Sequence, residues 1–411
     1  MGAAWLINKE AFFHAPWVDE LKLKFSIGQQ GNDNIGERTM AMRGFAFTDM
    51  YNLVAASDSQ MSATFWRIGN PEITWETATN LNIGLEFSLF SGRLSGSLDY
   101  YNKTTTDLLF WLSVPEAAGS RGYYGNAGDI RNSGVELSLV GSPVRTKDVD
   151  WSLSFNIAHN KDKILRLPAS KTALTGGFIE QGLWYVEGGP IYNKFLPEYA
   201  GVNEKGEALY YVDSQLGAGV TNRPGTNRDE TTTDINSATR YAQGRSMPVA
   251  YGGFGTQLTA YGFDLSLSFD YQLGGKIYDG AYQQLMSNTA SASDAGRAFH
   301  KDVLRSWTPE NKTTGLPRLY YGDKYTGGDS DRWLTSARYL NFQSFSVGYT
   351  LPQRVVARLG LNKLRIYATG ENLYFWSARK GLDPRYAYDE TEALTVYSPM
   401  RTIMGGIQLS F

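Results

Sequence analysis

Apolar and polar residues alternate along much of this chain. The clearest case is 263–272, where apolar Phe263, Leu265, Leu267, Phe269 and Tyr271 interleave with polar Asp264, Ser266, Ser268, Asp270 and Gln272. The last residues repeat the pattern, with Ile403, Gly405, Ile407, Leu409 and Phe411 on one side. A period of two places successive side chains on opposite faces of an extended strand. These stretches are therefore predicted to be β-strands with one apolar and one polar face.

The same pattern predicts strands throughout the chain. They cover 3–8, 21–28, 81–89, 94–100, 135–139, 151–157, 249–260, 263–272, 339–351, 364–373 and 401–411, with two shorter strands within 182–199. The two-residue links Ser91-Gly92 and Tyr261-Gly262 are typical of tight hairpins. Between Phe342 and Phe345 the apolar residues change side, which predicts either a β-bulge or a strand end above the apolar band.

The links between these strands alternate in length. Short links lie near Ser91, Val144, Gly188, Tyr261 and Gln353, whereas longer ones lie near Gly44, Gly122, Gly176, Gly225, Gly315 and Asp389. The best strands are also long enough for a tilted crossing of a bilayer. Outer-membrane barrels have short periplasmic turns and long extracellular loops. The pattern therefore predicts an all-β, antiparallel transmembrane β-barrel, with Phe411 on the periplasmic side.

Composition narrows the possible chemistry. The chain lacks Cys and has 3 His, which excludes thiolate metal sites and disfavours a histidine-built centre. Its 39 Lys and Arg nearly balance 41 Asp and Glu, so there is no broad basic surface for nucleic acid. The 26 Tyr and 10 Trp fit aromatic belts at membrane interfaces. Residues 1–13 have neither the basic nor the sustained apolar segment of a secretory signal.

The polar strand faces offer little for catalysis. Glu86, Asp99, Glu136, Asp264 and Asp270 lie on different strands and are predicted to be solvated lining of a wet interior, although paired carboxylates can act as acid and base. Asp329-Ser330-Asp331 lacks EF-hand spacing, and the glycines at 252–255 have no strand-to-helix unit around them to form a phosphate loop. We expect no enzyme activity, no resident metal and no cofactor.

A series of short motifs resembles a known family. In chain order these are Asp19-Glu20-Leu21-Lys22-Leu23-Lys24, Asn126-Ala127-Gly128-Asp129-Ile130-Arg131-Asn132-Ser133-Gly134-Val135-Glu136, Glu198-Tyr199-Ala200-Gly201-Val202, Tyr251-Gly252-Gly253-Phe254, Arg305-Ser306-Trp307-Thr308-Pro309-Glu310-Asn311, Gly348-Tyr349-Thr350-Leu351-Pro352 and Gly370-Glu371-Asn372-Leu373. Each motif is weak alone, but their order over nearly the whole chain is specific. The chain resembles the C-terminal barrel region of SusC/RagA-type TonB-dependent transporters of Bacteroidota outer membranes.

The resemblance implies a role in nutrient uptake. Residues 1–411 would supply roughly 12–13 strands of a barrel of about 22 strands, without the plug, TonB box or signal peptide. Such a barrel imports oligosaccharides, or sometimes peptides, with a SusD-like lipoprotein and energy from the TonB complex, which acts through the N-terminal region. A terminal Phe resembles the signal read by the barrel-assembly machinery, the role expected of Phe411. We expect this part alone not to be transport-competent.

Aromatic residues in the predicted outer loops are the candidates for ligand contact. They are Trp111, Tyr123, Tyr124, Trp184, Trp333 and Trp376. An aromatic ring can pack on the apolar face of a sugar, but the same rings can instead pack within loops or anchor the interface. The alternation of apolar and polar residues also fits a soluble or surface-exposed all-β glycan-binding protein, so this alternative remains open from the sequence.

Overall fold

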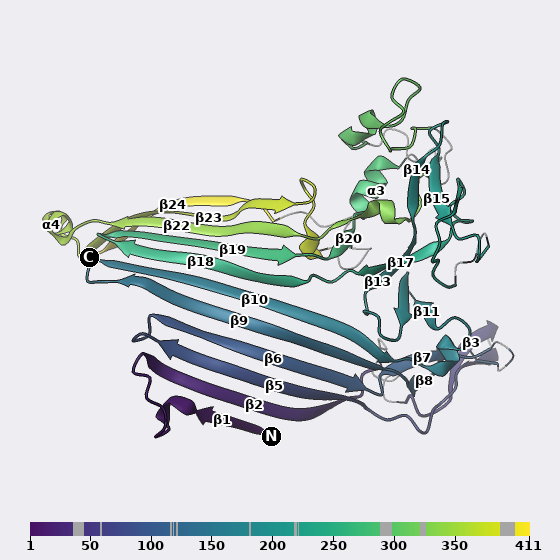
Figure 1. Cartoon of the computed structure of the whole chain (residues 1–411), viewed down its shortest axis with the longest axis horizontal. Helices are drawn as coiled ribbons and strands as arrows, with labels where there is room; N and C mark the ends of the chain where they lie inside the picture. The colour runs from purple at the N-terminus through teal and green to yellow at the C-terminus, as the bar shows by residue number, and fades with distance from the viewer. Residues whose placement is uncertain are drawn as a thin grey trace.

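A computed structural model gives the fold, and it describes every residue except 36–44, 58–59, 116, 118, 121, 181, 218–219, 221, 288–297, 321–325 and 387–398. The dominant element is a sheet of 11 strands in the order β1-β2-β5-β6-β9-β10-β18-β19-β22-β23-β24. Every neighbouring pair is antiparallel. Figure 1 shows the sheet as one long, twisted layer, with β1 along one edge and β24 along the other. We call this sheet the wall.

The wall strands coincide with the longest alternating stretches of the sequence. They are β1 (Gly2–Leu6), β2 (Val18–Asn32), β5 (Glu76–Leu89), β6 (Leu94–Thr106), β9 (Asp129–Arg145), β10 (Val149–Arg166), β18 (Ala250–Ala260), β19 (Phe263–Leu273), β22 (Tyr339–Thr350), β23 (Lys363–Ser377) and β24 (Thr402–Ser410). The count of 11 is below the expected 12–13 because β12 (Leu183–Val186) and β13 (Asn193–Pro197), from the stretch 182–199, belong to a separate 4-stranded sheet. Strands this short cannot cross a bilayer.

One face of the wall is apolar. Register places Phe155 opposite Phe254, Phe254 opposite Phe269, and Phe269 opposite Phe342. Large apolar side chains stay exposed there, among them Leu23, Phe25, Ile27, Ile83, Leu98, Val135, Leu153, Val347, Ile366, Ile403, Ile407 and Leu409. In water such a continuous surface would drive association, whereas hydrocarbon accommodates it. The apolar face is therefore the lipid-facing side, and the opposite polar face lines the interior.

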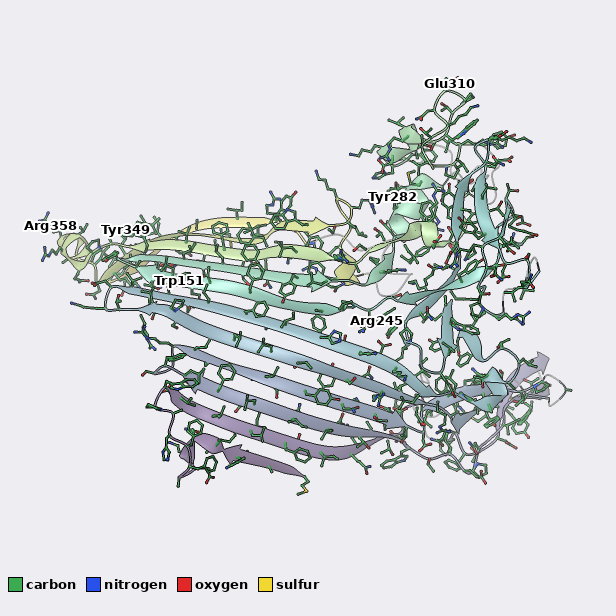
Figure 2. The ribbon with its side chains drawn as sticks, in the orientation of Figure 1. Trp151, Arg245, Tyr282, Glu310, Tyr349 and Arg358 are labelled. Atoms are coloured by element: carbon green, nitrogen blue, oxygen red, sulfur yellow. The ribbon has the colours of Figure 1, made fainter. Side chains whose placement is uncertain are left out.

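Aromatic side chains mark both ends of the lipid-facing side. Trp151 and Tyr349 lie near the end of the wall where the short links are, as Figure 2 shows. Trp151 Nε1 donates to Thr256 Oγ1 at 2.8 Å, and Tyr349 packs on Phe263 with ring centroids 4.4 Å apart. At the other end, Tyr374 packs against Trp376 with a centroid separation of 4.5 Å. Rings with one polar edge favour this position at each membrane interface.

The hairpins and the bulge follow the sequence closely. Tyr261 and Gly262 have φ of 50° and 90°, the left-handed conformation that both central residues of a type I′ turn require. In the pairing of β19 with β22, Ser268 faces Ser344 and Phe269 faces Phe342, so Gln343 is an extra residue. The predicted bulge between Phe342 and Phe345 is confirmed. It keeps Phe342 and Phe345 on the same lipid-facing side.

Connections alternate strictly in length around the wall. The short ones cover 7–17 with η1 (Ile7–Lys9), 90–93, 146–148, 261–262, and 351–362 with α4 (Gln353–Val356) and η6 (Ala357–Leu359). The long ones cover 33–75, 107–128, 167–249, 274–338 and 378–401. The short link expected near Gly188 lies inside the long connection 167–249, and Gly44 and Asp389 lie outside the described residues. Figure 1 shows the long connections gathered at one end of the wall, which is the extracellular end.

The long connections contain structure of their own. It comprises hairpins of β3 (Met50–Ser57) with β4 (Gln60–Arg67) and of β7 (Leu109–Ser113) with β8 (Gly122–Asn126); β11 (Gly177–Glu180), β12, β13 and β17 (Arg240–Arg245); β14 (Tyr199–Val202), β15 (Ala208–Val212) and β16 (Glu230–Thr232); β20 (Lys276–Tyr278) with β21 (Leu334–Ser336); and α2 (Ala169–Thr172), α3 (Gly280–Met286), η4 (Lys301–Arg305), η5 (Asp331–Trp333) and η7 (Pro384–Tyr386). We call the described parts of 167–249 and 274–338 the outer-loop body.

Most of the buried apolar side chains lie in the outer-loop body. Leu196 packs with Tyr278, Met286 and Trp333, so the two longest connections share one apolar cluster. Figure 2 places Arg245 where this body joins the wall. There its guanidinium donates to Asn160 Oδ1 at 3.0 Å. Among the described helices, none has both the length and the apolar character needed to cross a bilayer.

Candidate functional site

A groove of about 510 Å³ lies on the wall where β10, β18 and β19 run side by side. All but one of its polar residues have side chains on the interior face: Ser152, Ser154, Asn156, Gln257, Ser266, Ser268, Asp270 and Gln343, whereas Thr256 belongs to the lipid-facing side. On β18, Gly253 lies between Asn156 and Asp270, and Gly255 lies between Ser154 and Ser268. These two positions have no side chain, which hollows the wall between the flanking strands.

The floor of this groove is rich in uncharged hydrogen-bonding groups. Asn156 Oδ1 accepts from the Gly253 amide at 3.0 Å, and Ser268 Oγ donates to Gln343 Oε1 at 3.1 Å. The carboxylate of Asp270 accepts from Asn341 Nδ2 at 2.7 Å, which provides one hydrogen bond to its charge. Hydroxyl and amide groups both donate and accept hydrogen bonds. The groove can therefore bind an uncharged, hydroxyl-bearing ligand in several orientations.

The interior face carries a cluster of charges closer to the periplasmic end. Glu86 lies between two lysines, with Lys22 Nζ at 3.0 Å and Lys24 Nζ at 2.7 Å. Lys24 Nζ also lies 3.5 Å from Asp99 on β6, across Gly84 of β5. A Cβ at Gly84 would lie 2.2 Å from Asp99 Oδ1. The missing side chain is therefore what allows these charges to meet across an intervening strand.

A second ion pair crosses a glycine in the same way. Arg365 of β23 donates through Nε to Asp264 Oδ1 of β19 at 2.8 Å. Between them lies Gly348 of β22, where a Cβ would lie 2.6 Å from Arg365 Nε and 2.7 Å from Asp264 Oδ1. The interior position predicted for Glu86, Asp99, Glu136, Asp264 and Asp270 is confirmed by their common face. They were predicted to be solvated, but four of the five have polar partners on the wall, so solvent is not their only surrounding.

The last long connection is fastened to the outer-loop body by a buried ion pair. Arg379 donates to both carboxylate oxygens of Asp279 at 2.8 Å. Asp279 is 3% exposed and also caps α3 by accepting from the Tyr282 amide at 3.0 Å. Leu382 of the same connection packs on Ile277 and Ala337. Residues 378–386 are thereby held at the extracellular end of the wall.

Electrostatics inside the outer-loop body reflect burial and hydrogen bonding. Asp331 accepts from the Tyr199 amide at 2.7 Å, but desolvation by burial is the larger effect and raises the pKa of its carboxyl. Burial also raises the pKa of Tyr199 to about 12. Backbone amides of Asn227 and Thr226 donate to Asp213 and hold the pKa of that carboxyl well below its usual range. These groups order the loops, and no three or more His, Asp or Glu side chains among the described residues are grouped to hold a metal ion.

The structure brings two of the six predicted ligand-contact aromatics together. Trp111 on β7 lies directly opposite Tyr124 on β8, with ring centroids 5.1 Å apart. Tyr123 lies opposite Leu112, so its ring is on the other face of the same hairpin. Arg67 lies 5.5 Å from the Tyr124 ring centroid. The sequence pattern did not single out Arg67, and the only local signal was its neighbour Trp66. The Trp111 and Tyr124 rings form the β7–β8 aromatic cluster, in the long connection 107–128.

The other three aromatics lie elsewhere. Trp184 is 4% exposed and packs on Phe195, with ring centroids 5.5 Å apart. Trp333 is 1% exposed, and its Nε1 donates to the Gly328 carbonyl at 2.9 Å. Both rings are core residues of the outer-loop body in this conformation. Trp376 is exposed but shares the lipid-facing side with Tyr374, where an interface anchor belongs.

The chain end completes the placement of the predicted residues. Phe411 follows β24 directly and is 83% exposed. It lies at the same end of the wall as the short links, as Figure 1 shows. A role for Phe411 in barrel assembly stays a prediction.

Comparison with known proteins agrees with this architecture. Residues 13–202 match the family described as TonB dependent receptor-like, beta-barrel. TonB-dependent receptor P3 of Formosa agariphila is 28% identical over 99% of this chain and 41% of its own length. TonB-dependent receptor SusC of Bacteroides thetaiotaomicron is 27% identical over 93% of this chain and 37% of its own length. The chain is similar to the β-barrel sequence of TonB-dependent receptors.

Solved structures of RagAB share the fold of this chain. The structure of the RagAB peptide transporter matches with a TM-score of 0.75 and 26% identity, over 100% of this chain and 43% of that one. The RagAB peptide importer in its open-open state matches with a TM-score of 0.76. The chain thus spans about two fifths of the length of these relatives. The predicted resemblance to SusC/RagA-type receptors, the antiparallel membrane barrel and the outer-membrane location are confirmed.

Proposed function

We propose that this chain forms part of the wall and outer loops of an importer that takes up oligosaccharides. The observation that carries the proposal is the hydroxyl-rich and amide-rich groove on β10, β18 and β19. Its side chains can hydrogen-bond sugar hydroxyls, and four of the five carboxylates Glu86, Asp99, Glu136, Asp264 and Asp270 have polar partners. A neutral, hydroxylated cargo would then exchange hydrogen bonds with the wall and would bring no charge of its own that needs a partner.

Partners and energy source complete the proposal. The relatives are TonB-dependent receptors, which supports energisation by TonB through parts of the whole receptor beyond this chain. A SusD-like lipoprotein partner is supported by the likeness to SusC and by the two-component RagAB transporter. Insertion by the barrel-assembly machinery, with Phe411 as the signal, follows from the membrane barrel. Uptake is an activity of the whole receptor, with outer-membrane lipid around it.

A bulky residue in the groove tests the proposal. Ser266→Trp puts an indole on the groove floor, whereas the neighbouring Leu265→Trp puts the same indole on the lipid-facing side. In cells producing the whole receptor, we expect Ser266→Trp to lower uptake of labelled oligosaccharide at least tenfold and Leu265→Trp to leave it within twofold. Equal uptake by both variants, at equal amounts of folded receptor, would remove the groove from the cargo path.

Peptides are the second candidate cargo, because RagAB is described as a peptide transporter and matches over the whole chain. Competition separates the two classes. Unlabelled neutral oligosaccharides should displace labelled oligosaccharide from the purified receptor, while peptides of similar size should not. Displacement by peptides alone would assign the groove to peptide transport.

The β7–β8 aromatic cluster is the proposed surface for first contact with the cargo. Of the six predicted aromatics, only Trp111 and Tyr124 combine partial exposure with close packing of one on the other. We expect Trp111→Ala to weaken oligosaccharide binding to the whole receptor by about tenfold, since it removes a stacking face. Trp376→Ala, on the lipid-facing side, is the matched control and should leave binding unchanged. The reverse order of effects would transfer the ligand role to Trp376.

A further inference from the structure

Three cations extend the lipid-facing side of the wall beyond its apolar part. Along β10 the side chains on this face run Phe155, Ile157, His159, Lys161 and Lys163, because alternate residues of a strand share a face. The opposing residues on β9 run Leu139, Leu137, Val135, Ser133 and Arg131. Polarity therefore changes at the same level on both strands, from apolar to basic.

Arg131 and Lys163 face each other directly in the register. Directly opposite side chains have Cβ atoms about 4.5–5.5 Å apart, and like charges at that distance are unfavourable. Lys161 lies on the same face two residues along, at about 6.6 Å. Within the described part of the chain, no ion pair involves any of these three residues.

The next cation on β10 shows how the fold otherwise treats such a charge. Arg166 Nε donates to Asp129 Oδ2 at 2.7 Å, and its Nη2 lies 3.2 Å from Asp107 Oδ1. Glu187 belongs to the turn that passes Lys163, but its Oε1 accepts from the Leu167 amide at 2.9 Å, and no ion pair joins Glu187 to Lys163 within the described residues. The Arg131–Lys163 pair therefore lacks the carboxylate that its neighbour has.

The position of Arg131, Lys161 and Lys163 along the membrane normal indicates which layer of the bilayer they meet. Lys161 and Lys163 lie past the point where β18 begins at Ala250, because Ala158 is the last β10 residue paired with β18. They also lie toward the extracellular end, since β10 leads into the long connection 167–249. Directly beyond the hydrocarbon on that side is the headgroup layer of the outer leaflet. Anionic headgroups attract basic residues there.

We propose that Arg131, Lys161 and Lys163 bind a phosphate group of an outer-leaflet lipid. The planar Arg131 guanidinium can donate two parallel hydrogen bonds to one phosphate, and the lysines add point charges around it. The hydroxyls of Ser133, opposite Lys161, and Thr104, opposite Arg131, share this face and can donate further hydrogen bonds. The lipid's acyl chains would continue onto Val135, Ile157 and Phe155. This site lies outside the proposed cargo path, on the other face of the wall.

Lipid retention by the whole receptor, purified in detergent, tests the proposal. Native mass spectrometry would follow titration with bisphosphorylated lipid A, with the same lipid after removal of both phosphates, and with inorganic phosphate. We compare the wild-type receptor with Arg131→Gln, Lys161→Gln, Lys163→Gln and the triple variant. Lys147→Gln, in the short periplasmic link 146–148, removes one exposed charge at the opposite rim.

We expect each single substitution to weaken retention of the phosphorylated lipid about fivefold and the triple variant on the order of a hundredfold. Two controls accompany these variants. Lys147→Gln should leave lipid retention unchanged, and removal of the lipid phosphates should weaken retention by the wild-type receptor as much as the triple substitution does. Lys161→Arg with Lys163→Arg should retain the lipid, and heat-modifiable migration shows that each variant is folded. Equal retention by the triple variant and Lys147→Gln would overturn the proposal. So would equally strong binding of inorganic phosphate, which would make the site one for free anions.

Discussion

The assignment of the two wall faces makes a sharp prediction at neighbouring residues of β19. Leu267 lies four positions from Phe263 and six from Leu273, which bound the strand. At about 3.3 Å per residue and a tilt of about 40°, these separations correspond to roughly 10 Å and 15 Å along the membrane normal. The apolar band of a barrel is about 25 Å tall, so Leu267 lies near its middle. Arginine at such a depth costs about 2–4 kcal/mol.

Leu267→Arg should therefore lower the free energy of unfolding by about 2–4 kcal/mol, whereas Ser266→Arg, facing the interior groove, should cost less than about 1 kcal/mol. The assay is urea unfolding of the whole receptor in lipid bilayers, followed by heat-modifiable migration in gel electrophoresis. Equal costs at the two positions would refute the assignment of faces. A larger cost at Ser266 would reverse it and place the apolar side chains in a protein core.

Three further predictions concern single contacts. Gly348→Ala should lower the free energy of unfolding of the receptor by about 1–3 kcal/mol, because the added methyl group separates Asp264 from Arg365. Urea unfolding should show a smaller effect of Gly348→Ala in an Arg365→Gln background, where this ion pair is already absent. Arg379→Gln should lower the free energy of opening of α3, measured by hydrogen exchange, by about 3 kcal/mol, because Asp279 is left buried without its cation. Arg305→Gln is the control: the Arg305 side chain is 71% exposed, so this free energy should change by less than about 0.5 kcal/mol. Burial raises the pKa of Asp331, so the folded state binds this proton more readily than the unfolded state. The outer-loop body should gain stability from this group as the pH falls from 7 toward the carboxyl's ordinary value of 3.8, and exchange of the Tyr199 amide should lose that pH dependence in Asp331→Asn.

The wall could be predicted from the sequence because each strand meets lipid on one side and polar surroundings on the other. That contrast produces a period of two in stretches such as 263–272. The change of side between Phe342 and Phe345 also indicated the irregularity that the structure shows as an extra residue, Gln343. Turn residues with positive φ, such as Tyr261 and Gly262, then mark where adjacent strands reverse. Local patterns were sufficient for these elements because each wall hairpin pairs neighbouring segments.

The outer-loop body could not be predicted in the same way. Its sheets join distant segments, as when β13 pairs with β17, and its core joins Leu196 to Trp333. Short strands and the single-turn helices there have too few residues to establish a period. The six candidate aromatics show the consequence. In sequence, Trp333 and Trp111 both lie in long polar connections, and only tertiary packing separates the buried ring from the partly exposed one.

The glycines that let ion pairs cross the wall have a consequence for movement through the pore. At Gly84 and Gly348 a cation and an anion pair with each other across a residue that has no side chain. Neither charge is then available to bind a passing molecule strongly. The proposed neutral oligosaccharide cargo would pass these ion pairs without displacing counterions. Its speed through this part of the channel should then hardly respond to the ionic strength of the surrounding medium.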